Sequence, residues 1–384
     1  PSVGLSVVRS SNQLTSTTPD FLGRATTSER GYGSGSETLT IRQPVYRRYQ
    51  WAQLAQAEFQ VQDVESVLRV ETQNLAVRLG VAYFESLLAE EQWELEKALV
   101  TNYRFQLDAA NRLFQAGAGI RTDIDETRAR LDLALAREIE ARGAVEYTRR
   151  QLGVLVNQPV STLARLDIGR WRVDDLNPSG LTPWHEKAEA QSPELQVYRA
   201  RVEVARQELE KAKAGHWPTL DAVAQWSNSQ SENQLSVDSR YRSHSLGVQF
   251  NLPLYSGGGV SSAVRQALAA LARAEQLLEA GRRDLEVRVQ REYRGVTESV
   301  SRMAALEQAV RSADQALVSS KRSFEAGVRS RSDILAAESN RMVALRDLAQ
   351  ARYAYLMSWV RLRALVGDAD EDLVRGLNSR LTAG

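Results

Sequence analysis

The chain has 384 residues and a near-equal charge balance, with 49 Lys and Arg residues against 48 Asp and Glu residues. This balance excludes a general attraction to nucleic acid or to anionic lipid. The absence of cysteine excludes thiol catalysis. The sequence contains no run of about 20 apolar residues, so no membrane-spanning helix is predicted. Leu, Ala, Arg, Glu and Gln dominate the composition, which is typical of long helices.

Two strands are predicted at the start of the chain, over residues 2–13 and 36–43. Apolar and polar residues alternate along the second of them, which is the period of a sheet with two unlike faces. Residues 14–35 between them are rich in Ser, Thr and Gly, and we expect them to form a long loop. The sequence therefore predicts a first β-hairpin over residues 1–46.

A helix of nearly 70 residues is predicted from residue 47 to Phe114. At a rise of 1.5 Å per residue it would be about 100 Å long, so it needs partner helices of similar length. The return helix, residues 122–156, covers only half of that distance and completes a first helical hairpin over residues 47–156. The long helix carries one narrow apolar stripe at near-heptad spacing, formed by Val61, Val64, Leu68, Leu75, Leu79 and Ala82.

The bend between these two helices has a clear sequence signal. Gly117 is expected to end the incoming helix, because glycine adopts a positive φ without a steric penalty. Gly119 lies in the same bend. Thr122 is placed to cap the outgoing helix, and Asp123 would lie in its first turn, where the helix dipole favours a negative charge.

Residues 157–191 interrupt the helical pattern with several Pro and Gly residues and little periodicity. We expect a small structure there, beside the long helices. Ser192 and Pro193 then restart a helix, as its N-cap and its first residue, and this helix covers residues 192–215.

A second β-hairpin is predicted over residues 216–255. Its two strands alternate apolar and polar residues, and a polar loop over residues 227–243 separates them. The later strand has the clearest alternation in the chain, with an apolar face made by Leu246, Val248, Phe250 and Leu252.

The second half of the chain repeats the order of the first half. It contains a helical hairpin over residues 256–367, with its long helix at 261–326, and ends in a polar tail over residues 368–384. Self-similarity at a fixed offset predicts a duplicated architecture. The matching pairs are 44–46 with 253–255 at an offset of 209, and 114–124 with 324–334 and 152–156 with 362–366 at an offset of 210.

The second bend has the same design as the first. Gly327 is expected to end the incoming helix, and Ser332 is placed to cap the outgoing one. Asp333 would lie in the first turn after the bend, and Arg329 lies in the bend itself.

Each half thus supplies two amphipathic strands of about ten residues, which is the length of a strand in a membrane barrel. In lipid an open sheet edge is forbidden, because each unpaired backbone group costs several kcal/mol. Four strands cannot close a barrel, since transmembrane barrels begin at about eight. We therefore expect several chains to share one barrel. Aromatic residues near the strand ends are candidates for a membrane-interface girdle, namely Tyr46, Trp217, Trp226 and Tyr255.

The alternative is a soluble helical coiled-coil scaffold with two β-hairpins at one end. Against it, the apolar face of the last strand would have no core to cover. The two alternatives differ in extraction, because a scaffold would be soluble without detergent.

The sequence resembles the TolC family of outer-membrane channel proteins. The resemblance rests on both bend motifs, on Gln43-Pro44-Val45-Tyr46, on Pro193-Glu194-Leu195, on Asn251-Leu252-Pro253-Leu254-Tyr255-Ser256-Gly257-Gly258 and on Ala351-Arg352-Tyr353-Ala354-Tyr355-Leu356. It implies an α+β membrane protein in the outer membrane of a Gram-negative cell. Each protomer of a homotrimer would add four transmembrane strands to one shared β-barrel, which a long periplasmic α-helical barrel continues.

The resemblance also implies features around this frame. Residues 157–191 and 368–384 would form an equatorial belt around the helical barrel. A first helix that matches residues 192–215 would precede Pro1, together with a leader that has been trimmed.

The resemblance implies one of two related functions. One is the exit duct of type I protein secretion, which works with an inner-membrane ABC transporter and a periplasmic adaptor protein. The other is the outer-membrane channel of a multidrug or metal efflux pump. The stretch at residues 252–258 and the last helix are more similar to the secretion branch, so we favour secretion of a protein over efflux of a small molecule.

A periplasmic gate is implied at the two bends. The resemblance places acidic residues of a constriction at Asp123 and Asp333 and a polar link at Arg329. This chain departs from the family pattern with Ala336 in place of a second acid and Phe324 in place of a Tyr, which implies a looser constriction. Alternatively, both Asp residues only stabilise helix N-termini. Adaptor contacts would fall on the bends themselves, at Gly117, Gly119, Thr122, Gly327 and Ser332.

No catalytic or cofactor site is predicted. His185, His216 and His244 are isolated and have no metal-ligand spacing. Three glycines at 257–259 lack the Lys of a phosphate-binding loop, and a bend between strand and helix explains them. The sequence predicts neither an enzyme nor a metal protein.

Overall fold

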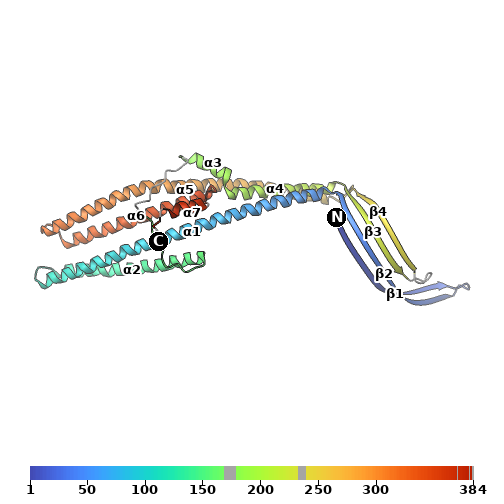
Figure 1. Cartoon of the computed structure of the whole chain (residues 1–384), viewed down its shortest axis with the longest axis horizontal. Coiled ribbons are helices and arrows are strands. Elements are labelled where there is room, and N and C mark those ends of the chain that lie inside the picture. The colour runs from blue at the N-terminus through green and yellow to red at the C-terminus, as the bar shows by residue number, and fades with distance from the viewer. Residues whose placement is uncertain (168–178, 232–238, 370, 380, 383–384) are drawn as a thin grey trace. The chain divides into compact units, whose positions relative to one another are not determined.

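The computed structural model describes residues 1–167, 179–231, 239–369, 371–379 and 381–382 (Figure 1). Parts of the predicted equatorial segment (168–178) and of the second predicted loop (232–238) lie outside the described residues. The described ends of that loop, 227–231 and 239–243, form paired strands instead, so the prediction is wrong there. The chain divides into two compact units, Pro1–Gln62 with Ala200–Gln276 and Asp63–Arg199 with Leu277–Gly384.

The first unit contains one four-stranded antiparallel sheet in the order β1-β2-β3-β4 (Figure 1). Its strands are β1 (Ser2–Pro19), β2 (Ala25–Tyr46), β3 (Thr219–Ser231) and β4 (Ser239–Asn251). The two predicted hairpins pair side by side through β2 and β3, with Leu39 opposite Trp226. Among the described residues, no further strand pairs with the outer edge of β1 or of β4.

The predicted loop over residues 14–35 is wrong. β1 and β2 stay paired as far as Pro19 and Ala25, and only a short turn joins them. Asp20 stabilises that turn, because its Oδ1 accepts hydrogen bonds from two backbone N–H groups, at 2.8 and 2.9 Å. The hydroxyl groups that suggested a loop instead pair across the ribbon, as in Thr17 with Thr27 at 3.0 Å.

The sheet has one apolar and one polar face. Residues opposite each other on neighbouring strands share a face, and one such row joins Val3, Ile41, Ala224 and Leu246. The neighbouring row, on the other face, joins Gly4, Thr40, Gln225 and Ser245, and Thr38 shares that face. The large apolar side chains of the first face are exposed, among them Val3 67%, Leu5 68%, Leu246 86%, Val248 70% and Phe250 63%.

The predicted repeat is present in the helices. Helix α1 (Arg48–Gln115) has 68 residues and α5 (Gly259–Glu325) has 67, while α2 (Arg121–Val156) has 36 and α6 (Arg331–Leu365) has 35. Helix α4 (Pro193–Lys213) begins at Pro193 directly after Ser192, as predicted. None of the described helices is long and apolar enough to cross a membrane.

The apolar core of the second unit lies between its helices. Near the middle of the long helices, α1, α5 and α6 bury Phe84, Leu285 and Tyr355 in one cluster. Helix α3 (Leu181–Gln191), which lies inside the predicted equatorial segment, adds Trp184, of which only 1% is exposed. The described part of that segment also pairs with the C-terminal tail, where Leu166 bridges to Leu381 just after α7 (Glu371–Asn378).

Candidate functional site

Both helical hairpins turn at the predicted glycines. Gly117 has a φ of 75° and Gly327 a φ of 74°, in the left-handed region that favours glycine. The N–H of each glycine donates to the carbonyl three residues earlier, at 3.0 and 2.9 Å. The following residues, Ala118 and Val328, each donate to the carbonyl five residues earlier, at 2.9 Å. Both bends are therefore Schellman motifs, which end a helix.

The prediction of the capping residues was wrong at both bends. Helix α6 begins at Arg331, and its N-cap is Ser330 rather than Ser332. Helix α2 begins at Arg121, so Thr122 lies inside the helix, and the N-cap position holds Ile120, whose side chain cannot accept a hydrogen bond. The signal for Ser330 was present in the sequence, since a Ser followed three residues later by an acid is the capping-box pattern.

Asp333 completes this capping box. Its Oδ2 accepts hydrogen bonds from the backbone N–H and from the hydroxyl of Ser330, both at 2.9 Å. The backbone hydrogen bond from Ser330 lowers the pKa of Asp333 most, followed by the side-chain bond, and Arg329 contributes a smaller attraction. Arg329 itself donates to Ser320 Oγ at 3.2 Å. The second bend thus brings Asp333 and Arg329 together on one tip.

At the first bend, Asp123 lies in the first turn of α2, as predicted. Gly119 is required by close backbone approach, because a Cβ there would lie 2.9 Å from the Phe114 nitrogen. The hydroxyl of Ser332, from the second bend, donates to Glu126 Oε1 of α2 at 3.0 Å. Ser332 therefore joins the two hairpins instead of capping its own helix.

Three of the four girdle candidates lie at or just beyond strand ends, since Tyr46 is the last residue of β2, Trp217 precedes β3 and Tyr255 follows β4. Trp226 was also predicted near a strand end, but β3 extends to Ser231 and Trp226 lies inside it. Tyr46 packs edge-on against Trp51 with ring centroids 5.2 Å apart. Trp217 stacks under the guanidinium of Arg48 at 4.5 Å. Trp226 lies on the apolar face of the sheet, and Tyr255 is 88% exposed just after β4. Aromatic side chains with one polar partner and one apolar side are typical of membrane interfaces.

A buried carboxylate near the same strand ends was missed by the sequence reasoning. Asp221 of β3 has a 5% exposed side chain, and Arg47 holds it with hydrogen bonds of 2.9 and 2.5 Å. Arg42 of β2 adds an ion pair at 3.4 Å. These partners lie more than 170 residues away in the sequence, so no local pattern could have indicated them.

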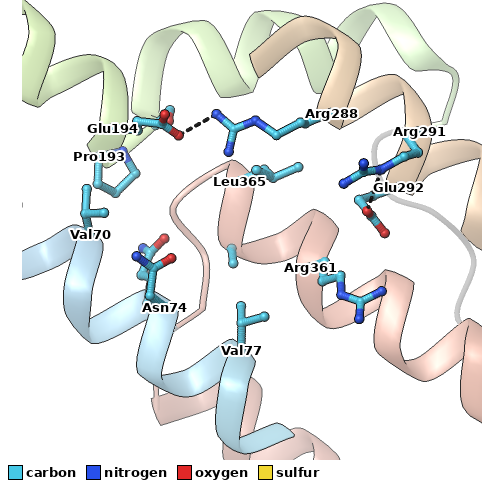
Figure 2. A pocket seen from close by; sticks show the side chains of 13 residues that line it. Val70, Asn74, Val77, Pro193, Glu194, Arg288, Arg291, Glu292, Arg361 and Leu365 are labelled. Carbon is cyan, nitrogen blue, oxygen red and sulfur yellow. Dashed lines mark hydrogen bonds and ion pairs between the residues drawn. The ribbon is translucent and has the colours of Figure 1, made fainter. Parts of the chain in front are cut away.

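Figure 2 shows a cavity of about 180 Å³ in the second unit, lined by α1, the first turn of α4, α5 and α6. Arg288 of α5 reaches across it to Glu194 at 2.5 Å and also pairs with Asp284 at 2.8 Å. Glu194 lies in the first turn of α4, where the helix dipole also favours its charge. The ion pair between Arg288 and Glu194 at this cavity therefore joins α5 to α4.

A sheet with an exposed apolar face, and with no partner strand at either edge among the described residues, is a feature expected of an outer-membrane channel protein, as are two hairpins of long helices. The chain belongs to the outer membrane efflux protein family, whose model matches residues 1–158 and 184–368. The predicted resemblance, the α+β fold and the outer-membrane location are thereby confirmed.

Relatives that are more than 30% identical to this chain include two proteins named for protease secretion. The alkaline protease secretion protein AprF of Pseudomonas aeruginosa is 35% identical over 344 residues, which cover 89% of this chain and 72% of that protein. The proteases secretion protein PrtF of Dickeya chrysanthemi is 31% identical over 347 residues, covering 90% and 75%. The outer membrane protein TolC of Vibrio cholerae is 31% identical over 349 residues, covering 90% and 80%.

Solved structures share the fold at lower identity. The outer membrane protein VceC of Vibrio cholerae superposes with a TM-score of 0.75 at 17% identity, covering 95% of this chain and 87% of that one. CusC superposes with a TM-score of 0.77 at 14% identity, covering 94% and 83%.

Proposed function

We propose that this protein is the outer-membrane exit duct of a type I protein secretion system and works as a homotrimer. The observation that carries the proposal is the sheet with an exposed apolar face, whose two outer edges have no partner strand among the described residues. In lipid each unpaired backbone group costs several kcal/mol, so the edges of β1 and β4 need partner strands. Pairing of β1 in one copy with β4 in the next would close a barrel without edges.

Secretion is favoured over efflux by the names of two relatives. AprF and PrtF, at 35% and 31% identity, are both named for protease secretion. The channel would receive an exported protein from an inner-membrane ABC transporter through a periplasmic adaptor, and it would have no catalytic activity of its own. The second candidate is the outer-membrane channel of a drug or metal efflux pump, which the name of the family favours.

Complementation would separate these two functions. The gene would be expressed in a strain that lacks its own exit duct but retains a protease transporter and adaptor. We expect protease to return to the culture medium. Restored resistance to drugs or metals without restored protease secretion would favour the efflux pump instead.

The arrangement of the chain across the outer membrane follows from the proposal. The turn at residues 20–24 would face outside, and both helical tips would face the periplasm, where Gly117, Gly119, Thr122, Gly327 and Ser332 would contact the adaptor. Residues 157–191 and 368–384 would form the equatorial belt. Protease added to intact cells should cut the outside turn and spare both tips, whereas cleavage at Gly117 or Gly327 in intact cells would reverse this topology.

We further propose that Asp333, Asp123 and Arg329 form the periplasmic constriction. The exposed Asp333 carboxylate would recur with the symmetry of the trimer, and a ring of like charge raises the local concentration of cations. The alternative, that Asp333 only stabilises a helix, has support in its capping box with Ser330. Ala336 and Phe324 remove two polar groups from the constriction, so we expect it to be loose.

Single-channel recording in planar bilayers would test the constriction. We expect Asp333→Ala to weaken cation preference and Arg329→Ser to raise conductance. Ser330→Ala is the matched control, because it removes the helix cap but keeps the charge of Asp333. If Asp333→Ala and Arg329→Ser both conduct and select like the parent channel, the constriction lies elsewhere.

A further inference from the structure

Strand β2 carries three glycines at alternating positions, Gly31, Gly33 and Gly35. Alternate residues of a strand lie on one face of the sheet, so these glycines share the apolar face with Leu39 and Ile41. Towards the turn that joins β1 to β2, the apolar face of β2 therefore continues into a strip without side chains.

Neither the backbone conformation nor the strand pairing requires these glycines. None of the three has a positive φ, and β2 stays in register with β1 through this stretch without a bulge. A Cβ added at Gly31 or Gly33 would meet nothing within 4 Å, whereas at Gly35 it would lie 2.7 Å from Arg9 Nη1. Glycine weakens a strand, and it often marks a place where a ligand approaches the backbone closely. The space over Gly33 is therefore open to a group from outside the chain.

A cavity of about 550 Å³ lies at this place on the sheet. The residues that line it include Gly33, Gly35, Arg9, Glu37, Asn228 and Gln230. Arg9 donates its Nη2 to Glu37 Oε1 at 2.6 Å, yet 63% of the Arg9 side chain stays exposed. The cavity thus offers one guanidinium, which suits phosphate, and two carboxamides, which can hydrogen-bond hydroxyl groups.

The cavity lies directly beyond the large apolar side chains of the same face. Glu37 is opposite Asn228, and the next row towards the helices holds Leu39 opposite Trp226. Tryptophan is enriched at the boundary between membrane and water. The proposed function places the turn between β1 and β2 outside the cell, so the cavity would lie at the level of the lipid headgroups of the outer leaflet.

The matching stretch of β4 carries basic residues. At the offset of 209 residues that relates 44–46 to 253–255, the three glycines of β2 match Arg240, Arg242 and His244. These residues alternate along β4 and share a face with Leu246. Basic side chains are attracted to anionic lipid. The two strands therefore offer, at equivalent places, a cavity and a row of basic residues that both suit headgroups with phosphate.

We propose that this cavity binds the phosphorylated sugar headgroup of a glycolipid in the outer leaflet. Arg9 would bind a phosphate oxygen, Asn228 and Gln230 would bind sugar hydroxyls, and the sugar ring would lie on the bare backbone at Gly33. The site rests on the proposed function, because that function sets which end of the sheet faces outside. A sugar fits better than a simple phospholipid, since a phosphate alone needs neither the carboxamides nor the room left by the glycines.

Titration of lipid into the purified oligomer in detergent would measure this binding. Native mass spectrometry would count bound molecules of lipopolysaccharide with a short sugar chain, and of phosphatidylglycerol, which has a phosphate but no sugar ring. We expect one lipopolysaccharide per chain, bound at least about tenfold more tightly than phosphatidylglycerol. Equal affinity for the two lipids would overturn the site, because charge alone would then explain the binding.

Substitution of the glycine tests the cavity itself. Gly33→Thr fills the open space, and we expect it to weaken lipopolysaccharide binding at least about tenfold. Gly4→Thr is the matched control, because Gly4 lies on the opposite face and a Cβ there also meets nothing within 4 Å; it should leave binding unchanged.

Assembly of the variant channel is checked by its heat-resistant oligomer. If Gly33→Thr does not assemble, Gly33→Ser takes its place. Unchanged binding in an assembled variant would overturn the site. Failure of both variants to assemble would also overturn it, because the glycine would then serve the curvature of the strand.

The two members of the ion pair separate binding from stability. Arg9→Gln removes the cation and should weaken lipopolysaccharide binding at least about tenfold. Glu37→Gln removes the competing anion and should keep or tighten binding. Unchanged binding in Arg9→Gln, or equal loss in both variants, would overturn the site. The readout does not depend on transport, so a failure of the proposed function would appear separately, as absent secretion with lipid binding as predicted.

Discussion

Helices α1 and α5 carry the same apolar stripe in two different surroundings. At the offset of 210 residues, Leu68 and Leu75 of α1 match Leu278 and Leu285 of α5. Leu285 is 2% exposed and lies in one cluster with Leu195 of α4, whereas Leu75 is 47% and Leu68 66% exposed. A heptad stripe therefore indicates that a helix needs a partner, but it does not say which segment supplies that partner.

The fit between α4 and α5 is close. A Cβ at Gly281 of α5 would lie 2.6 Å from the ring of Tyr198 in α4, so glycine is required for this approach. The matching position of α1 is Glu71, which is exposed. We expect a helix equivalent to α4 to cover the stripe of α1 in the assembled channel.

Truncation of the matched leucines of α1 and α5 should have a large effect on stability. Leu285→Ala leaves a cavity in a packed core, which costs about 2–5 kcal/mol. Leu75→Ala should destabilise the assembled channel to a similar extent if a helix covers its stripe. Thermal unfolding of the channel in detergent measures both. A Leu75→Ala channel as stable as the parent would mean that the stripe of α1 stays bare.

The two bends differ in their N-caps, because Ser330 caps α6 and the side chain of Ile120 cannot cap α2. Two substitutions would remove the cap from one helix and add a cap to the other. Ser330→Ala removes the cap of α6 and should cost about 1 kcal/mol. Ile120→Ser adds a cap to α2 and should stabilise its first turn by up to the same amount. Hydrogen exchange of the amides in each first turn reports the two effects separately. If Ile120→Ser leaves exchange at the first bend unchanged, the absent cap does not weaken that bend.

The capping box should also make the second bend sensitive to acid. The hydrogen bonds from Ser330 lower the pKa of Asp333 below its value in the unfolded chain. The carboxylate therefore contributes its stability above the ordinary Asp pKa of about 3.9, and this stability is lost as pH falls through the lowered pKa. Protection of the first amides of α6 should decline in that range. Asp333→Asn should remove this dependence, and persistence of the dependence would assign it to another group.

The smallest effect is expected at the turn between β1 and β2. A short insertion at residues 20–24 should leave channel assembly unchanged, because loop length costs little closure entropy. The same insertion after Thr27 should disturb the paired ribbon, since Thr27 bonds to Thr17. Yield of heat-resistant oligomer compares the two. Equal tolerance at both sites would mean that the ribbon is not paired in the membrane.

Helix positions and the repeat could be predicted from the sequence because their signals are local. Gly117 and Gly327 turn the chain where their spacing indicated, and Pro193 begins α4. The hydroxyl-rich ribbon was misread because Ser and Thr fit both loops and strands, and only cross-strand pairing decides between them. The prediction of Ser332 as a cap failed for a smaller reason, a shift of two residues in the start of α6.

The partners of buried charges could not be predicted. Glu338 meets Gln106 across 232 residues of sequence, and Asp221 meets Arg47 across 174. In both cases the sequence shows only a polar residue in an ordinary helical or strand pattern. The fold brings the partner into place. Because the carboxylate is buried, leaving it without that partner would cost free energy.

The mass of the protein extracted from the outer membrane shows whether other copies of the chain close the outer edges of β1 and β4. Native mass spectrometry in detergent should give three times the mass of a single chain measured under denaturing conditions, with no extraction in the absence of detergent. A monomer that dissolves without detergent would contradict the shared barrel and the channel built on it.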